Sequence, residues 1–229
     1  MTIRTKPLVE EASIESWWQL LQQQKAIAII RCGDRTLAYK MAQAAASGGI
    51  KLIEITWNSE DPDKLITQLR NELPECSIGA GTILNLHQLQ SAVAAGAQFA
   101  FAPNFNPRLL NTCQSRYKIP FIPGVYTPTE VVNAWQQGAK AVKIFPIKSL
   151  GGASYIKCLQ APLGHIPLIP TGGITVENAP AMIDAGAIAV GISSDLFPQR
   201  AIAIQDWSEI TSRAKHLLAK LKITHNYSI

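Results

Sequence analysis

Two residues of this sequence are well placed for covalent chemistry, because each is an ionisable group inside a short apolar segment. Lys143 lies in residues 141–146 (AVKIFP) and Glu54 in residues 51–57 (KLIEITW), and both segments have the pattern of a buried strand. A buried lysine has a lowered pKa, so part of it is the free amine that attacks a carbonyl and forms a Schiff base. Glu54 would supply a counter-charge and carry protons. A structural ion pair that only fills a core is the alternative interpretation.

The sequence offers no obvious set of metal ligands. Its histidines show no helical i, i+4 pairing and follow no apparent strand; they are His87, His165, His216 and His225. Its cysteines form no C-x-x-C pair and indicate reduced thiols; they are Cys32, Cys76, Cys113 and Cys158. A divalent metal can polarise a carbonyl group so that it accepts electrons during bond cleavage, and a lysine imine serves the same purpose. We therefore expect neither a metal nor a cofactor.

Length and composition favour one domain with one core. At 229 residues and 47% hydrophobic content, the chain can bury a large core, so we expect a single domain over residues 1–229. No apolar run is long enough to span a bilayer, and residues 1–13 lack the apolar core of a signal peptide, which predicts a cytoplasmic protein without a membrane partner. The net charge of +5 is partly gathered in residues 213–222, where a solvated helix face is favoured over nucleic-acid binding.

The elements that must position Lys143 and Glu54 recur regularly along the chain. Apolar, β-branched segments alternate with helix-like segments, which predicts a (β/α)8 TIM barrel. The expected strands span residues 26–31, 51–57, 77–83, 99–103, 120–125, 141–146, 168–171 and 187–191. The expected helices span residues 34–47, 61–72, 86–95, 107–117, 128–137, 153–160, 178–185 and 200–221. Residues 1–25 form an extension with an extra N-terminal helix over residues 13–21, whose tryptophans would cover the bottom of the barrel.

Polar residues gather where the expected strands end, which is the end of a barrel that carries catalysis. They are Arg31, Glu54, Thr56, Thr82, Asn104, Lys143, Thr171, Ser193 and Ser194. Because side chains alternate between the faces of a strand, Glu54 and Thr56 share one face, as do Lys143 and Phe145. If those faces point inward, Glu54 and Lys143 meet inside the barrel.

The loops after the last two expected strands carry a second indication of function. Gly172 and Gly173 follow the seventh strand, and Ser193 and Ser194 follow the eighth. Backbone N–H groups and hydroxyls in these loops make a phosphate site in many barrels, so we expect a substrate with a phosphate or a similar anion. Glycines that merely end the strands are the simpler explanation.

In these residues the chain resembles the KDPG/KHG aldolases, the class I lyases of 2-keto-3-deoxy sugar-acid phosphates. The match runs from about residue 26 to the last helix. It rests on residues 53–56 (IEIT), 79–85 (GAGTILN), 122–125 (IPGV), 142–146 (VKIFP) and 170–174 (PTGGI).

The resemblance implies reversible cleavage of 2-keto-3-deoxy-6-phosphogluconate to pyruvate and glyceraldehyde 3-phosphate, with 4-hydroxy-2-oxoglutarate as a further candidate substrate. It makes Lys143 the Schiff-base lysine and Glu54 the proton shuttle. It places Thr82 and Thr171 in the keto-acid pocket and packs Phe145 against the substrate chain. It also implies a homotrimer.

The chain departs from the family pattern at two positions. Asn58 stands where many members have an arginine that holds the substrate carboxylate. Arg31 matches an arginine that other members carry after the first strand, and we assign the carboxylate to it. Ser193 replaces a glycine of the phosphate turn, whereas Ser194 matches.

Three alternatives to the cleavage of 2-keto-3-deoxy-6-phosphogluconate stay open. Residues 58–59, 102–104 and 194–196 look more like the phosphogalactonate branch of the family, whose substrate is an epimer. A phosphate-binding isomerase or synthase would use Lys143 only to contact an anion. A non-catalytic sensor of sugar phosphates would account for the altered Asn58 and Ser193.

Overall fold

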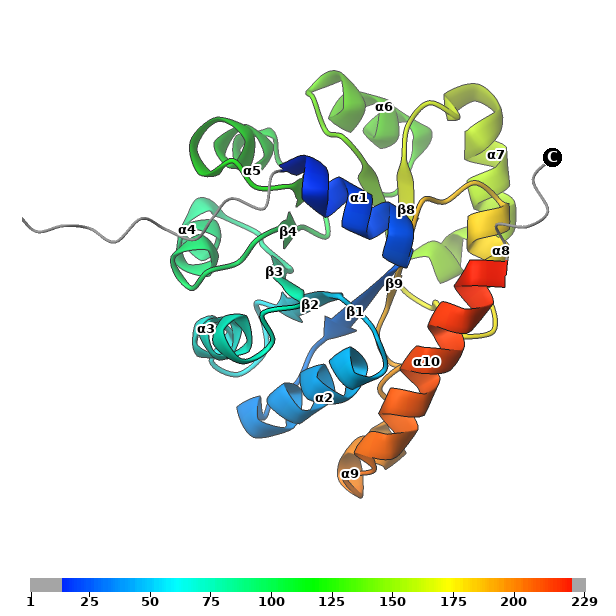
Figure 1. Ribbon diagram of the computed structural model, residues 1–229. Coiled ribbons are helices and arrows are strands. Elements are labelled where there is room, and N and C mark those ends of the chain that lie inside the picture. The colour runs from blue at the N-terminus through cyan, green and yellow to red at the C-terminus, as the bar shows by residue number, and fades with distance from the viewer. Residues whose placement is uncertain (1–13, 224–229) are drawn as a thin grey trace, which may run out of the picture.

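The computed structural model describes residues 14–223, and its strands all pair in parallel around a central barrel (Figure 1). The strands are β1 (Ala26–Ile30), β2 (Leu52–Thr56), β3 (Ser77–Gly81), β4 (Ala100–Phe101), β5 (Phe121–Ile122), β6 (Gly124–Val125), β7 (Val142–Ile144), β8 (Leu168–Pro170) and β9 (Val190–Ile192). They pair in the orders β5-β4-β3-β2-β1-β9 and β6-β7-β8.

Two features join these two sheets into one closed barrel. Pro123, which has no N–H to donate, separates β5 from β6, so the two short strands occupy one position of the barrel. An isolated parallel bridge between Thr171 and Gly191 connects the end of β8 to β9. The predicted (β/α)8 barrel is confirmed, with residues 120–125 divided into two strands.

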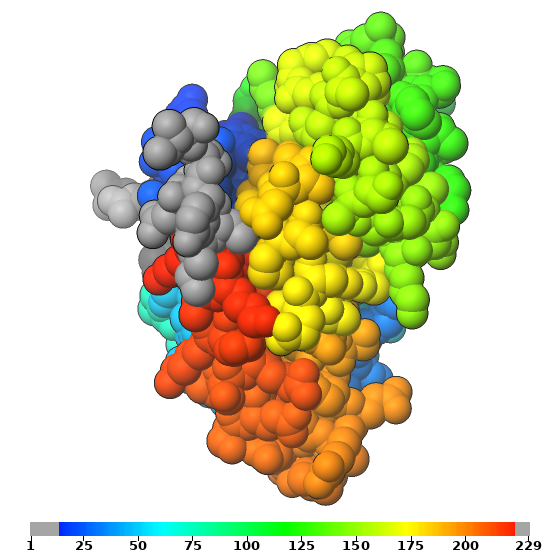
Figure 2. Space-filling model, turned by 90° about the vertical axis from the view of Figure 1, so that its right-hand side faces the viewer, coloured from blue at the N-terminus to red at the C-terminus, as the bar shows by residue number. Residues whose placement is uncertain are grey.

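The helices form a ring outside the strands (Figure 1). They are α2 (Arg35–Ser47), α3 (Pro62–Glu72), α4 (Leu86–Ala94), α5 (Pro107–Thr112), α6 (Pro128–Gln136), α7 (Ala153–Leu163), α8 (Ala179–Asp184), α9 (Gln199–Ala203) and α10 (Trp207–Ile223). Figure 2 shows α10 beside α8 on one side of the molecule, and α10 also packs against α2, where Thr211 donates a hydrogen bond to the Ala44 carbonyl at 3.0 Å.

Two of the expected helices differ from those observed. Residues 107–117 form α5 followed by a π-helical turn over Cys113–Tyr117. The expected helix 200–221 was wrong as one element, because the chain breaks between α9 and α10. Gln205 takes a left-handed φ of 55°, and the Asp206 carboxylate accepts the Glu209 N–H at 3.0 Å, which starts a new helix.

The predicted N-terminal helix is present as α1 (Ile14–Gln24), and it crosses the N-terminal end of the barrel (Figure 1). Trp17 and Leu21 are buried, and the Trp17 ring lies 5.2 Å from that of Phe99 inside the barrel. Residues 1–13 of the expected extension lie outside the described residues. Within residues 14–223, no helix is both long enough and apolar enough to cross a membrane.

The lower interior of the barrel is an apolar layer that supports the residues above it. Its members are Trp17, Leu21, Ile27, Ile29, Leu52, Phe99, Phe101, Ile122, Ala141, Ile169 and Ala189. Residues two positions further along a strand point to the same side. The alternation therefore places Arg31, Glu54, Lys143 and Thr171 above this layer, toward the carboxyl ends of the strands.

Candidate active site

Lys143 occupies the middle of β7 and is almost wholly enclosed, with 5% of its surface exposed. Its Nζ lies 4.9 Å from the centre of the Phe145 ring and 5.8 Å from that of Phe101. Burial lowers the pKa of Lys143, the charge of Glu54 raises it, and the charge of Arg31 lowers it further. The net direction is downward, which favours the free amine that imine chemistry requires.

Glu54 lies on β2 and has no exposed surface. Burial raises the pKa of its carboxyl group, while the charges of Lys143 and Arg31 lower it; the net direction is upward. Neither carboxyl oxygen has a hydrogen-bond partner among the described residues. A carboxyl group in this environment can both accept and return a proton. The charge of Glu54 raises the pKa of Lys143 and the charge of Lys143 lowers that of Glu54, as expected if both side chains face the barrel interior.

Arg31 follows β1 and is exposed, and its charge acts on both Lys143 and Glu54. Asn58 is exposed on the loop after β2. The structure thus places the cation of Arg31 within electrostatic reach of Lys143 and Glu54.

Ser59 is a buried residue whose structural position the sequence pattern did not predict. Its Oγ lies 3.1 Å from Thr56 Oγ1 and accepts the backbone N–H of Cys32 at 3.2 Å. The Glu60 N–H donates to the Cys32 carbonyl at 3.0 Å. These bonds join the loop after β1, which carries Arg31, to the loop after β2. In the sequence, two features drew attention to Ser59: its position just after the polar end of β2, and the resemblance of residues 58–59 to the phosphogalactonate branch.

Thr82, Thr171 and Phe145 lie at the carboxyl ends of three strands. Thr82 is half-buried and takes a left-handed φ of 59° directly after β3. Thr171 is 6% exposed, and its Oγ1 is buried without a hydrogen-bond partner among the described residues. Phe145 is half-buried, and a Cβ placed on Gly172 would lie 3.1 Å from its ring.

The two predicted phosphate loops lie together. Gly172 and Gly173 have φ values of 87° and 88°, a conformation that favours glycine. The bridge at Gly191 and a 2.8 Å hydrogen bond from the Val176 N–H to the Asp195 carboxylate hold the loops after β8 and β9 side by side. The Phe197 N–H donates to the Ser193 carbonyl at 3.0 Å, which closes a turn that leaves Ser194 exposed.

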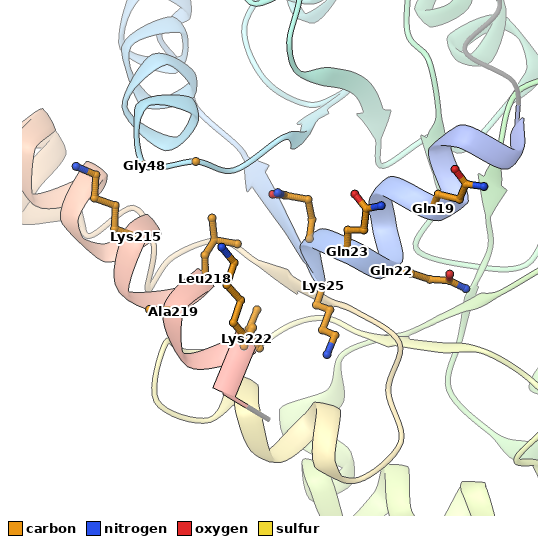
Figure 3. A pocket seen from close by; sticks show the side chains of 12 residues that line it. Gln19, Gln22, Gln23, Lys25, Gly48, Lys215, Leu218, Ala219 and Lys222 are labelled. Carbon is orange, nitrogen blue, oxygen red and sulfur yellow. The ribbon is translucent and has the colours of Figure 1, made fainter. Parts of the chain in front are cut away.

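A separate cavity of about 740 Å³ lies at the opposite end of the barrel, between α1 and α10 (Figure 3). Lys25, Lys215 and Lys222 line it, but Lys25 and Lys222 point in opposite directions. It contains none of the residues that we assign to catalysis or substrate binding. Among residues 14–223, no group of three or more His, Cys, Asp or Glu side chains could hold a metal ion.

The closed parallel barrel, with a buried lysine and a buried carboxyl group at the strand ends, has the architecture of a barrel enzyme. Comparison with known proteins gives the family. The model of the aldolase family described as KDPG and KHG aldolase matches residues 18–213, and the chain belongs to this family. The family resemblance expected from the sequence is confirmed, and the chain is a lyase.

Two relatives of named activity align with this chain over most of their length. The chain is 32% identical to the 2-dehydro-3-deoxy-phosphogluconate aldolase of Treponema pallidum, covering 88% of this chain and 95% of that one. It is also 32% identical to the KHG/KDPG aldolase of Escherichia coli K12, covering 81% and 87%. The structure of the KDPG aldolase from Legionella pneumophila, with pyruvate captured at low pH as a covalent carbinolamine intermediate, superposes with a TM-score of 0.81 at 29% identity, covering 91% and 99%.

Proposed function

We propose that this chain is a class I aldolase that reversibly cleaves 2-keto-3-deoxy-6-phosphogluconate to pyruvate and glyceraldehyde 3-phosphate. The observation that carries the proposal is the burial of the Lys143 amine and the Glu54 carboxyl group on neighbouring parts of the barrel interior, where each charge acts on the pKa of the other group. The printed names of the relatives support the same substrate, and the carbinolamine in the Legionella enzyme supports covalent chemistry with pyruvate.

The reaction begins when the free amine of Lys143 attacks the C2 ketone. Loss of water gives a protonated imine, which serves as an electron sink. Glu54 takes the proton of the C4 hydroxyl as the C3–C4 bond breaks. C4 becomes the aldehyde of glyceraldehyde 3-phosphate, which leaves, and the electrons of the broken bond move into the imine to give an enamine. Glu54 then returns a proton to C3, and hydrolysis releases pyruvate and the free lysine. The raised pKa of Glu54 suits a group that must both take and give a proton.

The remaining polar residues orient the substrate. Arg31 and Thr82 hold the carboxylate, and the unpartnered Thr171 hydroxyl also lines the keto-acid pocket. Phe145 packs against the carbon chain. The phosphate is bound at the loops after β8 and β9, by Gly172, Gly173, Ser193 and Ser194.

Cleavage of the galactonate epimer is the second candidate within this family. Asn58 and Ser59, in the loop after β2, favour it, because the sequence of this loop looks more like that of the phosphogalactonate branch. Both epimers present the same carboxylate, ketone and phosphate, so Lys143 and Glu54 would act on either one.

Pyruvate release from each epimer, followed by coupled oxidation of NADH with lactate dehydrogenase, tests the proposal. We expect turnover of at least one epimer, and we expect it to survive treatment with EDTA because the imine is the electron sink. Binding without pyruvate release from either epimer would favour the isomerase, synthase or sensor alternatives. We also propose a homotrimer, as expected for the family, which sedimentation equilibrium would test.

A further inference from the structure

The four residues that we assign to phosphate binding bring no charge of their own. Gly172, Gly173, Ser193 and Ser194 offer backbone N–H groups and hydroxyls, whereas a phosphate monoester carries a charge of about −1.5 to −2 at neutral pH. Asp195 adds a carboxylate next to Ser194. That carboxylate accepts the Val176 N–H at 2.8 Å and lies 3.9 Å from the Arg213 guanidinium, so it is already engaged within the protein. A cation from another loop would add the positive charge that these groups lack.

Lys148 lies on the loop after β7, directly beside the glycines. It belongs to a 3-10 turn, Ile147–Leu150. The Ile147 N–H donates to the Thr171 carbonyl at 2.9 Å, and the Lys148 N–H donates to the Gly172 carbonyl at 3.0 Å. Two consecutive backbone hydrogen bonds therefore fix the position of Lys148 relative to the loop after β8.

The Lys148 side chain runs along Gly173. A Cβ placed on Gly173 would lie 2.5 Å from Lys148 Cβ, 3.1 Å from Cγ and 3.0 Å from Cδ. The aliphatic stem thus covers the space that a larger residue at 173 would need, and the residue as a whole is exposed. A lysine with a packed stem and a solvated ammonium group is a common arrangement for a flexible cation.

We infer that the Lys148 ammonium group binds the substrate phosphate and makes the site selective for phosphorylated substrates. The inference rests on the proposed function, because the loops after β8 and β9 must hold the phosphate for Lys148 to reach it. Lys148 takes no part in the bond-breaking steps. Its contribution is a charge-assisted contact that a substrate without a phosphate cannot make.

The test compares Lys148→Gln and Lys148→Arg with the wild type and with Lys140→Gln. Lys140 is an exposed lysine that precedes β7, at the other end of the barrel, so its replacement removes the same charge away from the strand ends. Two measurements are made on each protein. One is kcat/KM for 2-keto-3-deoxy-6-phosphogluconate and for unphosphorylated 4-hydroxy-2-oxoglutarate, and the other is calorimetric binding of glycerol 3-phosphate, which requires no catalysis.

We expect Lys148→Gln to lower kcat/KM for the phosphorylated substrate about tenfold, mainly through KM, and to weaken glycerol 3-phosphate binding by a similar factor. Lys148→Arg should recover most of the loss, and Lys140→Gln should resemble the wild type. Cleavage of 4-hydroxy-2-oxoglutarate, if the wild type performs it, should be unchanged in all variants.

Equal glycerol 3-phosphate binding by Lys148→Gln and the wild type would overturn the inference, as would equal losses on the two substrates. Failure of the wild type to release pyruvate from any substrate would instead count against the proposed function. In that case the binding measurement still decides whether Lys148 contacts a phosphate.

Discussion

Gly81 lies directly against the carboxyl group of Glu54, and only a glycine fits there. A Cβ placed on Gly81 would stand 1.7 Å from Glu54 Oε1. The two residues come from neighbouring strands, with Glu54 opposite Gly79 and Thr56 opposite Gly81 in the β2–β3 register. Gly81 therefore creates the space that the buried carboxyl group of Glu54 occupies. The position of the proposed proton carrier depends on a neighbouring strand as much as on its own.

Gly81→Ala should displace Glu54 and damage both stability and activity. Overpacking of a tight interior costs about 1–3 kcal/mol in the free energy of unfolding. Denaturant unfolding and turnover should be measured on the same preparations. Gly33→Ala is the matched control, because a Cβ at Gly33 would meet nothing within 4 Å. Equal behaviour of the two variants would show that Glu54 tolerates displacement.

Glu54→Gln should separate imine formation from bond cleavage. The amide cannot carry the proton between C4 and C3, so turnover should fall about 10²- to 10⁴-fold, the usual contribution of a general acid or base. Trapping of pyruvate on the lysine should persist in part. Near-normal turnover would reduce Glu54 to a structural partner of Lys143.

Arg31→Ala should weaken pyruvate binding more than Asn58→Ala does. Loss of a charge-assisted hydrogen bond to the carboxylate costs about 1.5–3 kcal/mol, whereas a neutral amide offers no cation. Concentration-dependent trapping with pyruvate measures both variants. A larger loss in Asn58→Ala would contradict the assignment of the carboxylate to Arg31 and would indicate a different substrate.

The rate of imine formation should depend on pH through the pKa of Lys143. Only the deprotonated amine attacks, so the rate should rise with pH. Because burial lowers the pKa of Lys143, the rate should reach its plateau at a lower pH than it would for an ordinary lysine. Arg31→Ala removes a charge that lowers this pKa and should move the midpoint to higher pH. Glu54→Gln removes a charge that raises it and should move the midpoint to lower pH. Trapping rates across a pH series decide whether the two shifts have opposite signs.

Several parts of the site could be predicted because they depend on local sequence. The regular recurrence of strand-like segments predicts the barrel. The alternation of side chains between the two faces of β2 and β7 predicts that Glu54 and Lys143 both face inward. The burial of both side chains agrees with that prediction, as does the effect of each charge on the pKa of the other group. The roles of the individual residues in binding and catalysis stay predictions.

Other parts depend on contacts between distant segments, which periodicity does not encode. The hydrogen bond from the Cys32 N–H to Ser59 spans 27 positions, and the fit of Gly81 against Glu54 depends on the exact β2–β3 register. The packing of the Lys148 stem on Gly173 depends on how the loops after β7 and β8 lie side by side. The break before α10 comes from local capping by Asp206, within a segment whose apolar pattern continues through it.

Borohydride trapping with pyruvate, read by mass spectrometry of the intact protein and its peptides, tests the central claim most directly. We predict one reduced pyruvate adduct per wild-type chain, located on the peptide that contains Lys143, because Lys143 is a buried amine whose pKa is lowered by burial. Lys143→Ala should give no adduct. An adduct of equal yield in Lys143→Ala, or none in the wild type, would contradict the assignment of Lys143 as the Schiff-base residue.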